Sequence, residues 1–255
     1  MRIALINLGI FLSCIFYGFW QSYRTTRFFR PKGFELRDNL RLISVNLLCL
    51  CLLNTLGIWA FSHYFNTDFP LSFSLSFAKL SNAGIILAQF IFIAWLDDLV
   101  FYAWHRLLHS HPWLMRHIHG IHHRARKPYP IEFIYAHPIE WLGGAVGLFL
   151  ALALIIIFCG QINAYVMFGY SAFRTLREIT IHTEKPDKQA SWLNLLASAE
   201  SHRLHHELAR GNFASGFTYL DYLFGTKLKK SEQHKKPSPK EDPSSSGFGA
   251  RPLKG

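Results

Sequence analysis

Long uncharged apolar blocks are the feature of this chain that most restricts its fold. Five of them occur in the first 173 of its 255 residues, at 3–20, 42–61, 80–96, 142–159 and 162–173. A helix needs about 20 such residues to cross a bilayer. The blocks therefore predict an all-α, polytopic membrane protein with four to five transmembrane helices.

The composition favours the same fold class, because 50% of the residues are hydrophobic, 16% are aromatic and only 17% are charged. That balance is unusual for a soluble enzyme. The formal net charge of +11 would suit a nucleic-acid partner, but the chain contains no nucleic-acid-binding motif. The basic residues border the apolar blocks, so we interpret them as a collar facing the membrane surface and expect no nucleic-acid partner.

The first apolar block has an alternative interpretation as a secretory signal peptide, with Arg2 as its basic start. The block is long for a signal, however, and no small-residue cleavage site follows it. It ends at Trp20, and the next residues include Tyr23 and Arg24, which is typical of a membrane interface. We therefore favour a transmembrane helix.

The segment between the first two blocks is strongly basic. It contains Arg24, Arg27, Arg30, Lys32, Arg37 and Arg41, against only Glu35 and Asp38. The positive-inside rule places such a segment in the cytoplasm. If the spans alternate from there, residues 97–140 and the chain after Thr180 are also cytoplasmic. We therefore expect the clustered histidines to form a helical, metal-binding cap on the cytoplasmic side.

Eight of the 14 histidines fall into three groups with helical spacing. These are His105 and His109 in HRLLH, His119, His122 and His123 in HGIHH, and His202, His205 and His206 in HRLHH. Positions i, i+3 and i+4 share one helix face, whereas adjacent positions are splayed by about 100° and can reach different ions. Three groups offer more nitrogen ligands than one ion holds, which predicts two metal ions.

The histidines at 63, 111, 117 and 234 lie off this spacing, and we expect them to be ordinary surface or interfacial residues. Imidazole suits zinc, copper, nickel and iron, so ligand type alone does not identify the metal. A structural zinc site usually includes thiolates, and none of the four cysteines lies near the histidine groups. A pair of irons bordering lipid, serving oxygen activation, is our hypothesis.

Five motifs in the second half of the chain resemble, in the same order, the signatures of the fatty acid hydroxylase and sterol desaturase superfamily. They are DLVFYAWHRLLH (98–109), HGIHH (119–123), HP followed by Glu (137–140), HRLHH (202–206) and YLDYLFGT (219–226). The resemblance implies a membrane-bound, non-haem di-iron oxygenase that hydroxylates or desaturates a lipid C–H bond, fatty acyl or sterol-like. It also implies dioxygen, two iron ions and external electrons.

The three histidine boxes of the family match the eight grouped histidines, which the resemblance makes catalytic residues and metal ligands. Two further family positions match His182 in ITIHTEKP and His137 in YAHPIE, which it implies are ligands as well. For His137, orienting a neighbour or anchoring its loop is the alternative. The sequence departs from the family pattern at Thr183, Glu184 and Tyr135, which bears on the substrate subtype.

The third apolar block can continue as one helix from Ser81 to His109, about 43 Å long at 1.5 Å per residue. This exceeds the hydrocarbon core of about 30 Å, so the histidines of the first box would stand beyond the cytoplasmic interface. Nearby acids are candidate partners for imidazole N–H groups. The candidates are Asp98, Glu140, Glu200, Glu207 and Asp221.

We divide the chain into transmembrane helices at 1–96, a hydroxylase-like catalytic domain with two transmembrane helices at 97–226, and a basic tail at 227–255. The tail is rich in Lys, Pro, Ser and Gly, which predicts disorder. The alternating stretch PLSFSLSF (70–77) fits a strand, a re-entrant segment or an interfacial loop.

A histidine-rich metal-binding or metal-transport membrane protein is the main alternative function. Transport would need polar ligands in the middle of spans, but the apolar blocks contain no histidine or acid. A zinc protease would need H-E-x-x-H, and HELAR at 206–210 ends in Arg instead.

The sequence has neither a G-x-G-x-x-G turn nor a cysteine set for an iron–sulfur cluster. We therefore expect a separate electron-donor protein. The basic residues predicted to be cytoplasmic would steer an acidic carrier by long-range attraction, or would serve only as the collar for lipid headgroups.

Overall fold

The structure is a computed structural model that describes residues 2–28, 36–64, 77–126, 128–183 and 196–228. Within these ranges the regular elements are all helical, apart from one isolated bridge between Leu196 and Phe217. The all-α prediction is confirmed. The long helices are α1 (Arg2–Phe28), α2 (Leu36–Tyr64), α3 (Phe77–Ser110), α6 (Pro138–Cys159) and α7 (Ala164–Ile181).

Four helical segments are long and apolar enough to cross a membrane: Arg2–Arg24, Leu40–Tyr64, Ala83–Ser110 and Pro138–Cys159. Their outer surfaces expose large apolar side chains such as Phe16, Leu48 and Phe158, as a lipid-facing surface requires. The fifth apolar block lies in α7, which also carries two arginines and a glutamate and is not among these four. The protein is an integral membrane protein within the predicted range of spans.

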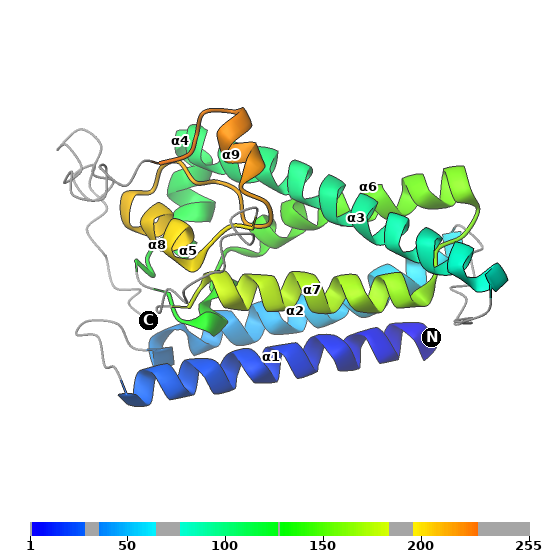
Figure 1. Ribbon diagram of the computed structural model, residues 1–255. Helices are drawn as coiled ribbons and strands as arrows, with labels where there is room; N and C mark the ends of the chain where they lie inside the picture. Colours follow the sequence, from blue (N-terminus) through cyan, green and yellow to red (C-terminus); the bar gives the residue numbers. More distant parts are fainter. Residues whose placement is uncertain (1, 29–35, 65–76, 127, 184–195, 229–255) are drawn as a thin grey trace.

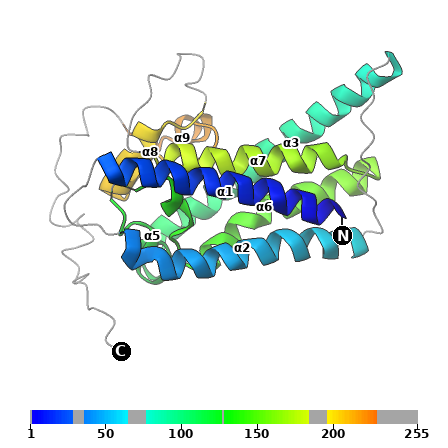
Figure 2. The same cartoon turned by 90° about the horizontal axis from the view of Figure 1, so that it is seen from below.

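α1, α2 and α7 lie side by side along one common direction, and α3 and α6 run obliquely to them (Figure 1). α1, α3 and α7 end, and α2 and α6 begin, at the end of the bundle where the short helices gather. Figure 2 shows α1, α2, α6 and α7 packed together, with the first turns of α3 projecting away from them. α3 packs mainly against α6, and α1 against α7. The bundle therefore delivers three helix C-termini to one site.

Short elements cap that end of the bundle. They are α4 (Pro112–Leu114), the π-helical turn η1 (Met115–His119), α5 (Gly120–His122), the 3₁₀ turn η2 (Pro130–Ile134), α8 (Ala199–Leu208) and α9 (Tyr219–Leu223). The break after α3 has a local cause: His111 precedes Pro112 and adopts an extended conformation, because a following proline disfavours the helical one. The chain thereby turns back over the bundle.

The packing of α3 against α6 depends on glycine. A Cβ atom on Gly147 would lie 2.8 Å from the Cα atom of Asp97 and 3.0 Å from its carbonyl oxygen. Both atoms belong to the backbone and cannot rotate away. The two helices therefore approach more closely at this level than any larger residue allows.

The continuous helix predicted from Ser81 to His109 is confirmed, because α3 runs from Phe77 to Ser110. Three other expectations concern segments that lie wholly or mainly outside the described residues. They are the alternating stretch at 70–77, the disordered tail at 227–255 and the basic segment between α1 and α2.

We expect Gly147→Ala to destabilise the protein by about 1–3 kcal/mol, the usual cost of overpacking, and to lower its melting temperature in detergent. Gly9→Ala is the matched control, because no atom lies within 4 Å of the Cβ position there. Equal melting temperatures for the two variants would contradict the close α3–α6 approach.

Candidate metal centre

Nine of the ten predicted ligand histidines converge in two groups at the capped end of the bundle. The ligand nitrogens of each group lie within 4.8 Å of one another. The five-histidine group contains His105, His109, His119, His123 and His205, and the four-histidine group contains His122, His182, His202 and His206.

Adjacent histidines are divided between the groups. His122 and His123 belong to different groups, and so do His205 and His206. α8 supplies the second pair, so the angular splay of neighbouring helical positions separates them. The second and third boxes thus each contribute to both groups, while α3 contributes only to the five-histidine group.

Backbone carbonyls fix the orientation of five of the imidazole rings. Each of these rings places Nδ1 2.7–3.1 Å from a carbonyl oxygen, and a carbonyl can only accept, so Nδ1 carries the proton. The pairs are His105 with Phe213, His109 with Ala209, His122 with Tyr135, His182 with Glu178, and His205 with Gly211. The lone pair of each ring is then on Nε2.

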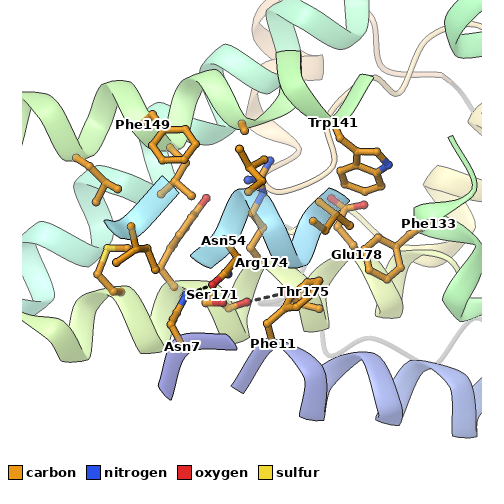
Figure 3. A pocket seen from close by; sticks show the side chains of 18 residues that line it. Asn7, Phe11, Asn54, Phe133, Trp141, Phe149, Ser171, Arg174, Thr175 and Glu178 are labelled. Atoms are coloured by element: carbon orange, nitrogen blue, oxygen red, sulfur yellow. Dashed lines mark hydrogen bonds between the residues drawn. The ribbon is translucent and has the colours of Figure 1, made fainter. Parts of the chain in front are cut away.

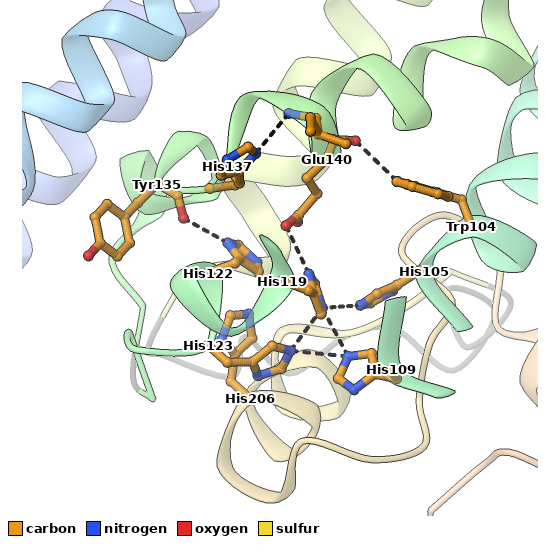
Figure 4. A network of polar contacts seen from close by, with 12 residues as sticks. Trp104, His105, His109, His119, His122, His123, Tyr135, His137, Glu140 and His206 are labelled. Carbon is orange, nitrogen blue, oxygen red and sulfur yellow. Dashed lines mark hydrogen bonds and ion pairs between the residues drawn. The ribbon is translucent and has the colours of Figure 1, made fainter. Parts of the chain in front are cut away.

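The Nε2 atoms of these and the other grouped histidines face one another across each group. In the five-histidine group, His119 Nε2 lies 3.1 Å from that of His105 and 2.9 Å from that of His109 (Figure 4). In the other group, His182 Nε2 lies 3.5 Å from that of His122. In both His122 and His182 the proton is on Nδ1, so their Nε2 atoms cannot hydrogen-bond to each other.

A metal ion bound between these nitrogens would account for their close approach. Two imidazole nitrogens bound about 2.1 Å from one ion, at right angles, lie about 3.0 Å apart, which is the spacing of most of these contacts. His205 Nε2 is buried and has no hydrogen-bond partner, as expected of an atom that awaits a metal. The residues therefore fit one transition-metal ion in each group.

Burial also keeps the imidazoles neutral. Burial lowers the pKa of His122 to about 4, although the hydrogen bond to the carbonyl of Tyr135 raises it in part. Burial likewise lowers the pKa of His202 and of His205 well below the ordinary value, with neighbouring histidines adding to the effect. The rings are thus unprotonated at neutral pH and need no deprotonation before they bind metal.

One carboxylate lies beside each of the two groups, a buried one on Glu140 and a partly buried one on Glu178. Glu140 Oε2 is 2.9 Å from His119 Nδ1 in the five-histidine group, and Glu178 Oε2 is 4.0 Å from His182 Nδ1 in the four-histidine group. Glu140 was among the predicted acidic partners. Glu178 was missed, although its position one helical turn before His182 is a signal that would have found it.

The other acidic candidates have different contacts. Asp98 accepts hydrogen bonds from the backbone N–H groups of Gly216 and Phe217, at 2.9 and 3.2 Å. Asp221 accepts one from the N–H of Phe213, at 2.8 Å. These two acids brace the loop that presents carbonyl groups to the histidines. Glu207 pairs with Arg203 on α8 at 3.5 Å, and Glu200 lies in the first turn of that helix.

Membrane helices position the second histidine box through η2. Ser22 on α1 accepts a hydrogen bond from the N–H of Ile131 at 2.9 Å, and Asn46 on α2 donates to the carbonyl of Ile134 at 2.8 Å. The next residue, Tyr135, offers its carbonyl to His122. Sequence reasoning missed both polar residues, which lie singly in or beside apolar stretches.

His137 lies outside both groups. It is half-buried, and its Nδ1 accepts a hydrogen bond from the N–H of Ile139 at 3.2 Å. His137 is therefore the N-cap residue of α6. This contact corresponds to the anchoring role that we weighed as the alternative to metal binding.

An apolar cavity lies within the helix bundle (Figure 3). It contains about 890 Å³ of empty space including its mouth, and is lined by α1, α2, α6, α7 and η2. A smaller hollow against the histidines shares four lining residues with it: Phe133, Trp141, Arg174 and Glu178. The apolar lining suits an apolar small-molecule ligand.

Comparisons with known proteins agree with this site. The family model for fatty acid hydroxylase matches residues 90–226, more than half of the chain. The chain belongs to this family, which confirms the resemblance read from the histidine boxes. No solved structure matches the chain.

The curated relatives include two kinds of protein. Very-long-chain aldehyde decarbonylase GL1-11 from Oryza sativa is 32% identical over 58% of this chain and 55% of its own length. Methylsterol monooxygenase 1 from Rattus norvegicus is 30% identical over 67% of this chain and 55% of its own. Methylsterol monooxygenase 2-2 from Arabidopsis thaliana is 34% identical over 54% of this chain. The matched region spans about half the length of these relatives.

We expect His119→Ala and His202→Ala each to remove about one equivalent of bound metal, because each deletes a nitrogen from a different group. The metal-to-protein ratio, measured by plasma mass spectrometry, tests this expectation. His117→Ala is the control, since His117 is exposed and belongs to neither group.

His137→Ala should keep the full metal content and lose about 1 kcal/mol of stability, the typical cost of removing an N-cap. If it releases as much metal as His119→Ala, His137 is a ligand after all.

Proposed function

We propose that this protein is a membrane-bound, non-haem di-iron oxygenase that hydroxylates or desaturates a lipid C–H bond. The observation that carries the proposal is the convergence of nine imidazoles, most of them buried, as two groups beside an apolar cavity between membrane helices. Family membership supports it, as do relatives named as a sterol monooxygenase and an aldehyde decarbonylase.

The five-histidine and four-histidine groups would each hold one iron ion. When bound, the iron pair supplies the redox chemistry that dioxygen activation requires. The nine histidines are then the metal ligands of the site. Their neutral rings leave the positive charge of the metals largely uncompensated, so Glu140, beside His119 Nδ1, would strengthen ligand basicity.

The remaining chain would bind and orient the lipid. Phe133 and Trp141 line both the cavity and the hollow beside the histidines, so they would guide an apolar chain from one to the other. Burial of the histidines, of which His205 is fully enclosed, excludes bulk water. A dry site prevents side reactions of the activated oxygen.

We further propose that the histidine centre lies on the cytoplasmic side of the membrane and receives electrons from a separate carrier protein. The basic residues near the end of α1 support this orientation through the positive-inside rule. Metal transport is less well supported, because the imidazoles gather at one end of the helix bundle and not along a path through it.

We expect the purified protein to contain about two irons and to consume dioxygen only when a reductant and a lipid are present. Elemental analysis, an oxygen electrode and mass spectrometry of the lipid products test this proposal. A preparation fully loaded with iron that is inert toward fatty acyl, aldehyde and sterol lipids would contradict it.

Turnover with an acidic soluble carrier should fall as ionic strength rises, because salt screens long-range attraction to the basic surface. Turnover with a small chemical reductant should stay nearly constant over the same range. A similar salt dependence with both donors would argue that the basic residues serve only as a collar for lipid headgroups.

A further inference from the structure

Two asparagines face each other in the apolar cavity. Asn7 on α1 donates a hydrogen bond from Nδ2 to the Oδ1 atom of Asn54 on α2, at 3.2 Å. Both residues line the cavity (Figure 3). Asn7 is only 2% exposed, and its own Oδ1 atom is buried without a hydrogen-bond partner. A polar pair inside membrane helices is costly, which points to a function.

The pair lies at the end of the cavity remote from the histidines. Gly18 on α1 is level with Ile179 on α7, because a Cβ on that glycine would contact the isoleucine side chain at 3.1 Å. Asn7 precedes Gly18 by 11 residues, about 16 Å along the helix axis. Ile179 is one turn from the ligand His182, so the cavity separates the amides from the metal centre by roughly that length.

The unused hydrogen-bonding groups define the chemistry of a ligand. A pair of amides that exchanges one hydrogen bond leaves one carbonyl oxygen and one NH₂ group available, whichever way each amide is assigned. A hydroxyl group donates to the first and accepts from the second. A carboxylate, ester or ketone only accepts, and would leave the buried Asn7 oxygen unsatisfied.

Polar lining residues nearer the histidines are already engaged. Arg174 contacts Asp97 at 3.2 Å and donates to the carbonyl of Gly144 at 2.7 Å. Among the described lining residues, the only other buried side-chain atom without a partner is Nε1 of Trp141, at the histidine end. Asn7 Oδ1 is therefore the acceptor available to a ligand at the far end.

We propose that Asn7 and Asn54 form a binding site for the hydroxyl group of a lipid whose other end reaches the metal centre. This inference rests on the proposed function. If the protein is an oxygenase, its substrate is a lipid that carries a hydroxyl group and is oxidised at a carbon far from that hydroxyl. The amide pair then acts as a positioning element, because anchoring one end of the molecule selects the carbon that lies at the other.

Binding of matched lipid pairs tests the site without requiring turnover. The iron-loaded full-length protein is titrated in detergent, under argon and without reductant. The probes are 1-hexadecanol against hexadecane, and cholesterol against cholestane, with palmitate as the acceptor-only head group. At least one alcohol should bind about fivefold to tenfold more tightly than its hydrocarbon partner and than palmitate, the range for a buried hydrogen bond.

Asn7→Leu should reduce this preference to less than about twofold while iron content stays unchanged. Asn54→Leu provides a second variant from the other helix. Ser13→Ala is the matched control, because Ser13 lies on α1, is exposed, and bonds only to the carbonyl of Gly9. It should keep the full preference.

Equal affinity of wild-type protein for alcohol and hydrocarbon, or no binding of either alcohol, would overturn the inference even if the oxygenase reaction is demonstrated. So would a preference that survives in Asn7→Leu, which would place the hydroxyl elsewhere. The converse result is also possible: the protein binds alcohols selectively through Asn7 but oxidises no lipid. That result would support this binding site and overturn only the proposed function.

Discussion

The structure depends on an arrangement that is unfavourable without a cation: imidazole lone pairs directed at one another. Where Nδ1 is held by a carbonyl, Nε2 has no proton to share. His105, His109 and His205 are held in this way within one group, and His122 and His182 within the other. Repulsion between these nitrogens must be offset by surrounding packing until a metal binds. The rest of the cap supplies that restraint.

The carbonyl groups that orient the rings come from places where the helical pattern ends. Inside a helix each carbonyl is already bonded, so free acceptors occur at C-termini and in loops. Ala209 follows α8 with a φ of 51°, and Gly211 with a φ of 57°. A Cβ on Gly211 would lie 2.7 Å from the carbonyl oxygen of Thr226. Asp98 and Asp221 then brace the same loop, so the segment around Asp221 shapes the site although Asp221 belongs to neither histidine group.

The histidine spacing predicts which residues form the metal centre better than it predicts the contacts that hold them in place. The helical period and the angle of about 100° between adjacent side chains predict that His122 and His123 bind different ions, because both depend only on helix geometry. The same reasoning applies to the length of α3. The contacts of Ser22 and Asn46 with η2 could not be predicted, because they join residues about 90 to 110 positions apart. Metal binding by His137, which the resemblance implies, stays a prediction, because the contact seen among the described residues is that of an N-cap.

A buried polar side chain is more informative in a membrane helix than in a soluble protein. Water cannot satisfy an amide in the hydrocarbon region, so a buried polar atom there is either bonded within the protein or destabilising. Ser22 and Asn46 are both bonded to the cap. The Oδ1 atom of Asn46 is also buried without a partner, but Asn46 does not line the cavity. Asn7 is bonded through one atom and open through the other. Because the cavity runs from that open atom toward the histidines, the helices that carry the metal site also define the length of the molecule that can reach it.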